Sequence, residues 1–473
     1  MATQIKFGTD GWRGIIADDF TFENVRRCAQ GMAQYLIATG QTTRGLVVGH
    51  DTRFQAEQFA QAVAEVIAAH GIKVYLVDRP TPTPVISFAI LDKRAHDAVN
   101  LTSSHNPPIW GGFKVRADYA GAIAPDGLKQ IEALIPPTEQ IKRIAFKDAQ
   151  ARGLVEIFDP KPAFRAQLDK LVNIEPLRRA GLTVAVDSMW GAGMGWFQEL
   201  LAGGTTRVVE IHNHRNPGFQ EMNNPEPIPP NVNHLMELVK RERAHVGIAT
   251  DGDADRVGAS TETGVFINQL QMYALLTLYL LEVRKMRGAI VKTLNTTSML
   301  DKLGARFNVP VYETGVGFKY VAPKILETNA LIGGEESGGY AFQNHIPERD
   351  GIVAGLFLLD FVVQTGKTPS QLLEHLFELV GPHYYERIDT DFPEEQRGAI
   401  VARLQSAQPS DVAGFKVTGI NTTDGYKYLL DDGGWMCIRF SGTEPIMRFY
   451  VETTRDEKRR DILQAGLKLA GLK

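Results

Sequence analysis

The chain has 473 residues and a formal net charge of −4, which excludes a single small domain and predicts about three or four domains. The near balance of charge gives no electrostatic reason to expect nucleic acid or an acidic membrane as a partner. Cys28 and Cys437, the two cysteines, are too few for a disulfide framework. Because we find no secretion signal and no apolar stretch long enough to span a bilayer, we expect a cytoplasmic protein.

Between residues 45 and 327, short apolar runs alternate with helical patterns, which predicts parallel sheets with crossover helices. The pairs of strand and helix are residues 45–49 and 57–70, 73–77 and 84–91, 183–186 and 191–201, 289–291 and 298–303, and 311–313 and 320–327. Two stretches interrupt the alternation. Residues 159–162 predict a domain junction, and the proline-rich residues 216–231 predict a long loop.

After about residue 381 the pattern changes to closely spaced strand candidates followed by a basic helix. The candidates are residues 414–418, 426–430, 435–440 and 447–452. This order predicts a smaller antiparallel α+β module at the C-terminus.

Three aspartates at alternate positions, Asp251, Asp253 and Asp255, follow the apolar run of residues 246–250. If the backbone is extended there, the three carboxylates point the same way. Their mutual repulsion favours a cation that takes oxygen ligands. Because sites in open α/β sheets lie at strand ends, we interpret the segment as an active-site metal loop.

Two alternatives for this segment are a solvated acidic turn and a calcium-binding loop between two helices. In the calcium loop the aspartates take positions 1, 3 and 5, and Glu262 takes position 12. Position 6 of such a loop needs glycine, and this chain has Arg256. The apolar run before the loop also predicts a strand rather than an incoming helix.

Two further loops carry groups suited to chemistry. Residues 102–107 place hydroxyls and an imidazole directly after the strand candidate of residues 96–101, although the same residue types also form ordinary turns. Residues 333–339 combine glycines with two carboxylates and a hydroxyl, a set that suits hydrogen bonding to a sugar or else makes a plain surface loop.

Two arginines, Arg439 and Arg448, flank a Ser, Gly, Thr turn near the C-terminus. Paired guanidinium groups with hydroxyls and backbone amides suit a phosphate dianion, and the alternative is a salt-bridged hairpin. Near the start, residues 8–14 form another glycine-spaced loop, which carries Arg13.

Taken together and in this order, the five segments resemble the α-D-phosphohexomutase family, which includes phosphoglucomutase, phosphomannomutase and phosphoglucosamine mutase. The likeness runs from Phe7 to about Tyr450. It implies an α/β protein with four domains around a central cleft: three similar mixed-sheet α/β/α units and a C-terminal α+β domain like the TATA-binding protein. We place these domains at residues 1–150, 151–259, 260–378 and 379–473.

By this resemblance, Ser104 is the phosphorylated serine and holds Mg²⁺ together with Asp251, Asp253 and Asp255. The resemblance also implies four residues around the phosphoryl-transfer centre, namely Arg13, His105, Lys114 and Arg256. Sugar recognition falls to Glu335 and Ser337. The other implied substrate-binding residues are Lys319, His345, Arg439, Ser441, Gly442, Thr443 and Arg448.

The implied activity interconverts hexose 1-phosphate and hexose 6-phosphate, with glucose 1,6-bisphosphate as activator and intermediate. Phosphoryl transfer depends on positioning and charge neutralisation, which suits a metal with cationic side chains. Lys114, His105 and Arg256 are candidates for the general base, and we favour Lys114. The implied partners are small hexose phosphates, with no nucleic acid and no membrane, and the chain is expected to be a monomer or homodimer.

The sequence departs from the family pattern at two positions. Ser103 stands where alanine is common, so it competes with Ser104 as the phosphorylation site. Gly339 stands where phosphomannomutase-like members and phosphoglucosamine mutases carry histidine, and His345 is a candidate replacement. Because residues 313–319 and 345–351 resemble phosphoglucomutases, we favour glucose phosphates, with mannose phosphates second.

Three alternative functions remain open at this point. They are a glucose 1,6-bisphosphate synthase, a phosphoglucosamine mutase, and a non-catalytic protein that binds sugar phosphates.

Overall fold

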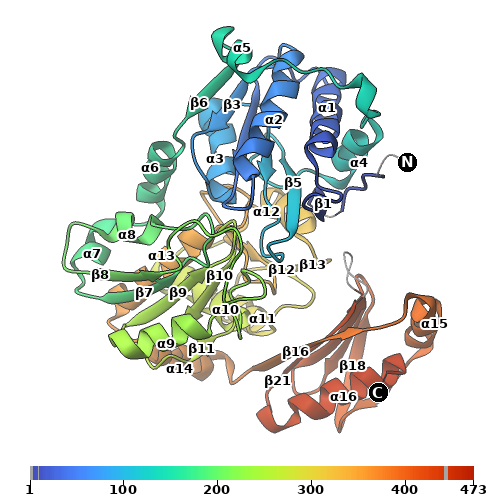
Figure 1. Cartoon of the computed structure of the whole chain (residues 1–473). Coiled ribbons are helices and arrows are strands. Elements are labelled where there is room, and N and C mark those ends of the chain that lie inside the picture. Colours follow the sequence, from blue (N-terminus) through green and yellow to red (C-terminus); the bar gives the residue numbers. More distant parts are fainter. Residues whose placement is uncertain (1–3, 9, 441–445, 473) are drawn as a thin grey trace.

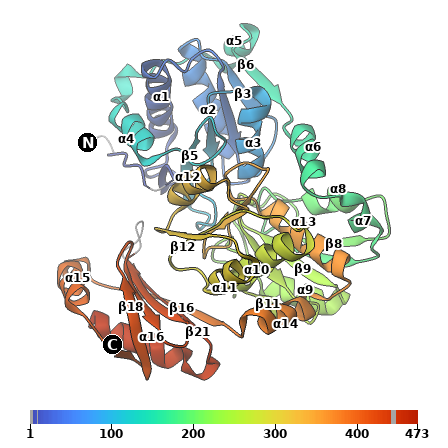
Figure 2. The same ribbon diagram turned by 180° about the vertical axis from the view of Figure 1, so that it is seen from behind.

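The computed structural model describes residues 4–8, 10–440 and 446–472 and contains four β-sheets (Figure 1). Three mixed α/β units are followed by a C-terminal domain built on an antiparallel sheet, which confirms the predicted fold class. In both views the first unit lies above the second and third, and the C-terminal domain lies beside the third (Figure 1, Figure 2).

The first sheet has the strand order β1-β5-β4-β2-β3-β6. Its central strand β2 is apolar on both faces, because Leu46 and Val48 contact the core under α1 and α2 while Val47 contacts α3. The strands are β1 (Trp12–Ile15), β2 (Leu46–His50), β3 (Val74–Val77), β4 (Asp97–Leu101), β5 (Trp110–Arg116) and β6 (Val155–Phe158). The helices are α1 (Phe22–Ala38), α2 (Ala56–Ala69), α3 (Thr83–Lys93), α4 (Pro125–Ala133) and α5 (Phe146–Ala151).

The second sheet has the order β11-β10-β9-β7-β8, with β7 parallel to both β8 and β9. Its strands are β7 (Thr183–Asp187), β8 (Arg207–Ile211), β9 (Val246–Thr250), β10 (Val257–Ser260) and β11 (Phe266–Ile267). Its helices are α6 (Lys161–Leu171), α7 (Ile174–Arg179), α8 (Trp196–Leu201) and α9 (Asn233–Glu242).

The third sheet has the order β13-β12-β14-β15. Its strands are β12 (Ile290–Thr293), β13 (Val311–Thr314), β14 (Ile332–Gly334) and β15 (Tyr340–Phe342). Its helices are α10 (Gln269–Leu278), α11 (Met299–Phe307), α12 (Phe318–Thr328), α13 (Gly351–Thr365) and α14 (Pro369–Val380), and a π-helical turn (Tyr279–Val283) follows α10.

The fourth sheet has the order β16-β21-β20-β19-β18-β17. Its strands are β16 (Tyr384–Asp391), β17 (Asp411–Val412), β18 (Phe415–Asn421), β19 (Tyr426–Leu430), β20 (Trp435–Phe440) and β21 (Ile446–Thr453). The two α-helices described in this domain are α15 (Arg397–Ser406) and α16 (Arg459–Ala470).

The second and third units share one hydrophobic core, which also includes Trp435, Cys437 and Tyr450 of the fourth domain; the first and fourth units have further cores of their own. Helix α13 explains the sharing, because it is apolar on all sides and contacts both β9 of the second unit and α10 of the third. Ile248, Leu275 and Leu356 lie in this common core. Among the described residues, no single helix is long and apolar enough to cross a membrane. Helices α13 and α14 meet the length and composition criteria only when taken together, and they are bent by 85° relative to each other.

Most predicted elements agree with the structure to within a few residues, with three differences. Helix α8 begins only at Trp196, and residues 191–195 before it form turns beside the aspartate loop. Strand β6 pairs with β3, so the first sheet extends past residue 150. Strand β11 pairs with β10, so the second sheet extends past residue 259.

Candidate active site

The aspartate loop begins where β9 ends at Thr250, as predicted, but it turns rather than continuing as extended chain. Ala254 has a left-handed φ of 55°, and its N–H donates to the carbonyl of Asp251 at 3.0 Å. The Oδ1 atom of Asp251 accepts the N–H groups of Asp255 (3.0 Å) and Arg256 (3.1 Å). This turn brings one oxygen from each of the three aspartates within 4.8 Å of one another. The expectation that an extended backbone aligns the carboxylates is therefore wrong.

Both alternatives for this segment disagree with the structure. All three aspartates are 0% exposed, which excludes a solvated acidic turn. Glu262, the twelfth position of a calcium loop, instead bonds the hydroxyl and backbone N–H of Ser370 at the start of α14. A calcium ion bound in this loop would therefore lack its ligand from the twelfth position.

Ser104 lies in the loop after β4, and its hydroxyl Oγ donates to Asp251 Oδ2 at 2.9 Å. Its backbone has a left-handed φ of 52°, and its N–H donates to Thr102 Oγ1 at 2.9 Å. Thr102 in turn donates to Asp51 Oδ2 at 2.5 Å. The neighbouring Ser103 has a buried hydroxyl with no hydrogen-bond partner among the described residues. The geometry therefore directs Ser104, rather than Ser103, at the aspartates.

Arg53 holds the serine loop in place, and our sequence analysis missed it. Its side chain is 2% exposed and lies 3.2 Å from Asp51. Its guanidinium donates at 2.7–3.0 Å to the backbone carbonyls of Ser104, Asn106, Pro107 and Trp110. The sequence could have indicated this residue, because it follows β2 by three residues and β2 is the strand next to β4.

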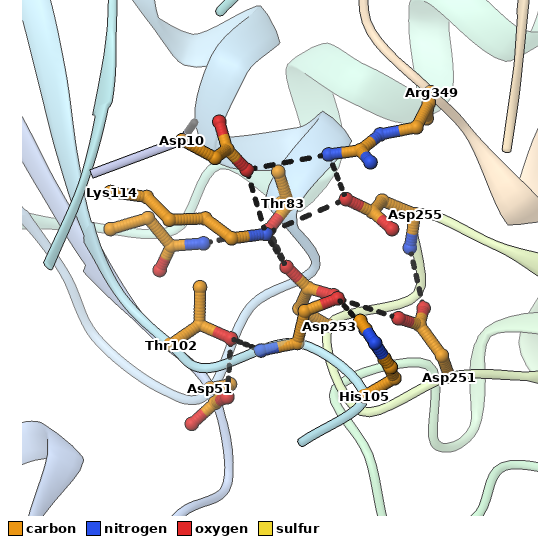
Figure 3. Close-up of polar contacts among 12 residues, drawn as sticks. Asp10, Asp51, Thr83, Thr102, His105, Lys114, Asp251, Asp253, Asp255 and Arg349 are labelled. Carbon is orange, nitrogen blue, oxygen red and sulfur yellow. Dashed lines mark hydrogen bonds and ion pairs between the residues drawn. The ribbon is translucent and has the colours of Figure 1, made fainter. Parts of the chain in front are cut away.

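Lys114 on β5 reaches the aspartate loop from the first unit (Figure 3). Its Nζ lies 2.7 Å from Asp253, 3.4 Å from Asp10 and 3.6 Å from Asp255. Burial alone would lower the pKa of this ammonium, but the three carboxylates outweigh burial and raise the pKa. Lys114 therefore carries a proton at neutral pH.

Arg349 connects the first three units through one guanidinium, and sequence reasoning gave it no role (Figure 3). Its Nη2 atom lies 2.9 Å from Asp255 and 3.4 Å from Asp10, and its Nη1 atom lies 3.3 Å from Glu335. These contacts link the metal-loop aspartate to the sugar loop. Because they join residues far apart in the chain, no local pattern indicated them.

The other residues expected at the transfer centre gather around Ser104. His105 Nδ1 lies 3.4 Å from Ser104 Oγ, and burial, with Arg256 and Arg13 nearby, holds the pKa of this imidazole well below its ordinary value. His105 is therefore neutral at pH 7. Arg13 donates to Asn106 Oδ1 at 2.7 Å, and Arg256 Nη1 lies 3.3 Å from a glutamate of the long loop, Glu226.

The expected sugar loop joins β14 to β15 and contains Glu335 and Ser337. Burial, only partly offset by Arg349, raises the pKa of Glu335. The Ser337 hydroxyl is buried and has no hydrogen-bond partner in the described part of the chain. Glu336 accepts a 2.5 Å hydrogen bond from the Tyr385 hydroxyl of the fourth domain. In this loop, therefore, Glu335 contacts Arg349, Ser337 has no hydrogen-bond partner among the described residues, and Glu336 ties the loop to the fourth domain.

His345 and Lys319 were the other residues expected to bind the sugar. The His345 imidazole is fully buried, contacts Asp350 Oδ2 at 2.9 Å and packs beside the rings of Phe88 and Phe164. Asp350 is the N-cap of α13, so His345 packs against the start of that helix. Lys319 lies in the first turn of α12.

The expected phosphate loop is partly described, since Ser441, Gly442 and Thr443 lie outside the described residues. Arg439 on β20 and Arg448 on β21 stand directly opposite each other across the antiparallel pair. Like charges in this arrangement are destabilising unless an anion compensates them. Each arginine also has an acidic neighbour, Asp424 at 2.9 Å from Arg439 and Asp389 at 3.7 Å from Arg448.

The aspartate loop has the donor set of a hard divalent cation. Its ligands are carboxylate oxygens, the type that magnesium prefers, and Asp253 Oδ1 is buried without a hydrogen-bond partner among the described residues. These observations fit a metal held by Asp251, Asp253 and Asp255.

Four segments of the chain match the phosphoglucomutase/phosphomannomutase family. Its alpha/beta/alpha domains I, II and III match residues 4–142, 162–264 and 268–380, and its C-terminal domain matches residues 391–467. The phosphoglucomutase/phosphomannomutase of Thermococcus kodakarensis is 33% identical over 469 residues, which cover 98% of each chain. A protein assigned as a phosphoglucosamine mutase, from Methanothermobacter thermautotrophicus, is 32% identical over 96% of this chain and 95% of its own.

The fold agrees with a solved relative as well. A crystal structure of a protein assigned as a phosphomannomutase, from Thermus thermophilus, has a TM-score of 0.86 and 36% identity, with complete coverage of both chains. With all four family domains in order along one chain, the protein belongs to the phosphoglucomutase/phosphomannomutase family and is a phosphohexomutase, an isomerase of hexose phosphates.

Proposed function

We propose that this phosphohexomutase interconverts hexose 1-phosphate and hexose 6-phosphate through a phosphoryl group carried on Ser104. The hydrogen bond of 2.9 Å from Ser104 Oγ to Asp251 Oδ2 carries the proposal, because it sets a hydroxyl of the first unit against the aspartates of the second. A covalent phosphoserine divides the isomerisation into two phosphoryl transfers.

In the first transfer, the free hydroxyl of a bound hexose monophosphate attacks phosphoserine 104, and the bond from phosphorus to Oγ breaks. The products are a hexose 1,6-bisphosphate and a free serine, which receives the proton that the sugar hydroxyl loses. After the bisphosphate turns over, Ser104 Oγ attacks its other phosphoryl group. This second transfer restores the phosphoserine and returns the proton to the departing sugar oxygen.

The cationic side chains around Ser104 suit a reaction that depends on charge neutralisation. Lys114 holds a proton while Asp253 and Asp255 contact it, so in this arrangement it acts as a cation, and it becomes a base only if those contacts weaken. His105 is neutral and lies 3.4 Å from Ser104 Oγ, so it can accept a proton without first losing one. Lys114 and His105 are therefore both candidates for the base.

We infer that the metal is Mg²⁺ and that glucose 1,6-bisphosphate is the activator. Asp251, Asp253 and Asp255, together with the phosphoryl group on Ser104, would hold the ion. When bound, Mg²⁺ supplies positive charge that stabilises the phosphoryl oxygens during transfer.

Replacing Lys114 with methionine is expected to lower kcat by about 10²- to 10⁴-fold, because the change removes both the cation and a candidate base. Substrate affinity should persist, since the phosphate and sugar groups of the third and fourth domains are untouched. Steady-state kinetics together with calorimetric titration of glucose 1-phosphate would measure both. A near-normal kcat would remove Lys114 as the base.

We propose glucose phosphates as the preferred substrates, with mannose phosphates second. The sugar loop has no room for a side chain at Gly339, where an added Cβ would lie 2.3 Å from Arg349 Cδ. Recognition from this loop therefore falls to Glu335 and Ser337, with Arg349 occupying the space behind them.

The sugar preference is tested by comparing glucose, mannose and glucosamine 1-phosphates with Mg²⁺, with and without a hexose 1,6-bisphosphate. We expect glucose 1-phosphate to be isomerised fastest. Much faster isomerisation of mannose 1-phosphate or glucosamine 1-phosphate would contradict this preference. Accumulation of free bisphosphate without isomerisation would instead indicate a synthase.

A further inference from the structure

The turn between β18 and β19 connects the fourth domain to the third through Asp424. The Oδ2 atom of Asp424 accepts hydrogen bonds from Arg439 Nη2 (2.9 Å) and from the backbone N–H of Val316 (2.8 Å). Its backbone carbonyl accepts a third, from Arg439 Nε at 3.1 Å. One residue thus contacts both a phosphate-loop arginine and the loop of the third domain.

These contacts fix the orientation of the Arg439 guanidinium. They use its Nε and Nη2 atoms, and Nη1 has no acceptor among the described residues. The arginine lies flat along the turn because Gly425, at φ +102°, leaves space that a Cβ 2.4 Å from Arg439 Cγ would fill. A guanidinium held along one edge presents its other edge to an anion in a fixed direction.

Through the backbone N–H of Val316, Asp424 also contacts the loop that precedes α12. Val316 stands three residues before Lys319, which is in the first turn of that helix. The same hairpin is docked to the third domain at a separate point, where Glu313 accepts hydrogen bonds from Asn421 (2.8 Å) and Lys427 (2.6 Å). Of these docking residues, only Asp424 also contacts Arg439.

We propose that Asp424 is a positioning residue that orients Arg439 for the substrate's non-reacting phosphate and fixes its distance from the loop before Lys319. This inference rests on the proposed function and on the phosphate-binding role that the family resemblance implies for Arg439. It couples phosphate recognition in the fourth domain to substrate recognition in the third. An opposing effect is repulsion between the Asp424 carboxylate and the phosphate, and it is the weaker effect because this carboxylate is one-third exposed and solvent-screened.

The test compares Asp424→Ala and Asp424→Asn with a matched control, Asn421→Ala. The control removes a contact of the same hairpin with Glu313 but leaves Arg439 untouched. For Asp424→Ala we expect KM for both hexose phosphates to rise about tenfold and kcat to change by less than about threefold. The reason is that the non-reacting phosphate is bound equally in the ground state and the transition state. Asp424→Asn keeps an acceptor for Val316, so its KM should rise less. In Asp424→Ala, the inhibition constant of inorganic phosphate as a competitive inhibitor should rise by the same factor as KM.

Several outcomes would overturn the inference. One is an unchanged or lower KM in Asp424→Ala. Another is an equal rise of KM in the Asn421→Ala control, which would indicate a purely structural contact between the domains. If the wild-type enzyme fails to isomerise hexose phosphates, the proposed function fails. Calorimetric titration with inorganic phosphate then decides the role of Asp424 separately, and equal affinity in the wild type and Asp424→Ala would reject it.

Discussion

Replacing Ser104 with alanine is expected to lower turnover by at least about 10⁴-fold, because the change removes the oxygen that carries the phosphoryl group. The fold should survive. The lost hydroxyl contacts only two side chains among the described residues, those of Asp251 and His105, and Asp251 keeps two backbone N–H donors. Steady-state kinetics would measure the loss, and circular dichroism would check the fold.

The adjacent serine provides a matched control. The Ser103 hydroxyl is buried and has no hydrogen-bond partner among the described residues, so Ser103→Ala removes no such contact. We expect its turnover to stay within about twofold of the wild type, as for other changes that leave the reacting group in place. Intact mass and phosphopeptide mapping should place the phosphate on Ser104. Phosphate on Ser103 alone, or an active Ser104→Ala enzyme, would contradict the assignment.

The chemical groups at strand ends were the part of the site that the sequence predicted best. Ser104 follows β4 and Asp251 follows β9, and in open α/β sheets such loops gather reacting groups. Their meeting across two domains, at 2.9 Å, is a tertiary contact that no local pattern contains. Family resemblance supplied the pairing that local sequence patterns did not.

The geometry of the aspartate loop was beyond sequence reasoning for a different reason. A left-handed alanine such as Ala254 is unfavourable by itself, so backbone preference predicts an extended chain there. The surrounding structure overrides that preference. Gly191 lies so close to the loop that an added Cβ would come within 2.7 Å of the Asp251 carbonyl.

Arg53 and Arg349 were missed because each acquires its role only through distant partners. Arg53 bonds carbonyls more than fifty residues later in the chain, and Arg349 contacts Asp10 near the opposite end. His345 is the converse case. Family resemblance implied that it binds substrate, whereas its side chain is buried and packs beside Phe88 and Phe164.

Removing divalent cations with a chelator is expected to lower turnover by at least about 10³-fold, and adding Mg²⁺ should restore it. The charges of the loop give the reason. Lys114 and Arg349 contact Asp253 and Asp255, but among the described residues no side-chain cation lies within ion-pair distance of Asp251. Burial and the neighbouring aspartates raise the pKa of Asp251 well above its ordinary value, and Arg256 offsets this only in part, so a bound cation would stabilise its ionised form.

A measurement independent of activity distinguishes a metal site from an acidic cluster without one. At a concentration of 100 times Kd, Mg²⁺ should stabilise the folded protein by about 2.7 kcal/mol, which raises the midpoint of thermal unfolding. Asp251→Asn should abolish this rise, because the amide keeps the shape and the backbone hydrogen bonds at Oδ1 but removes the charge. Glu262→Gln is the matched control and should keep the full rise, since Glu262 bonds Ser370 and not the loop. A rise kept in Asp251→Asn would contradict the metal site, and a rise lost in both variants would restore the calcium-loop interpretation, because Asp251 and Glu262 are both ligands of such a loop.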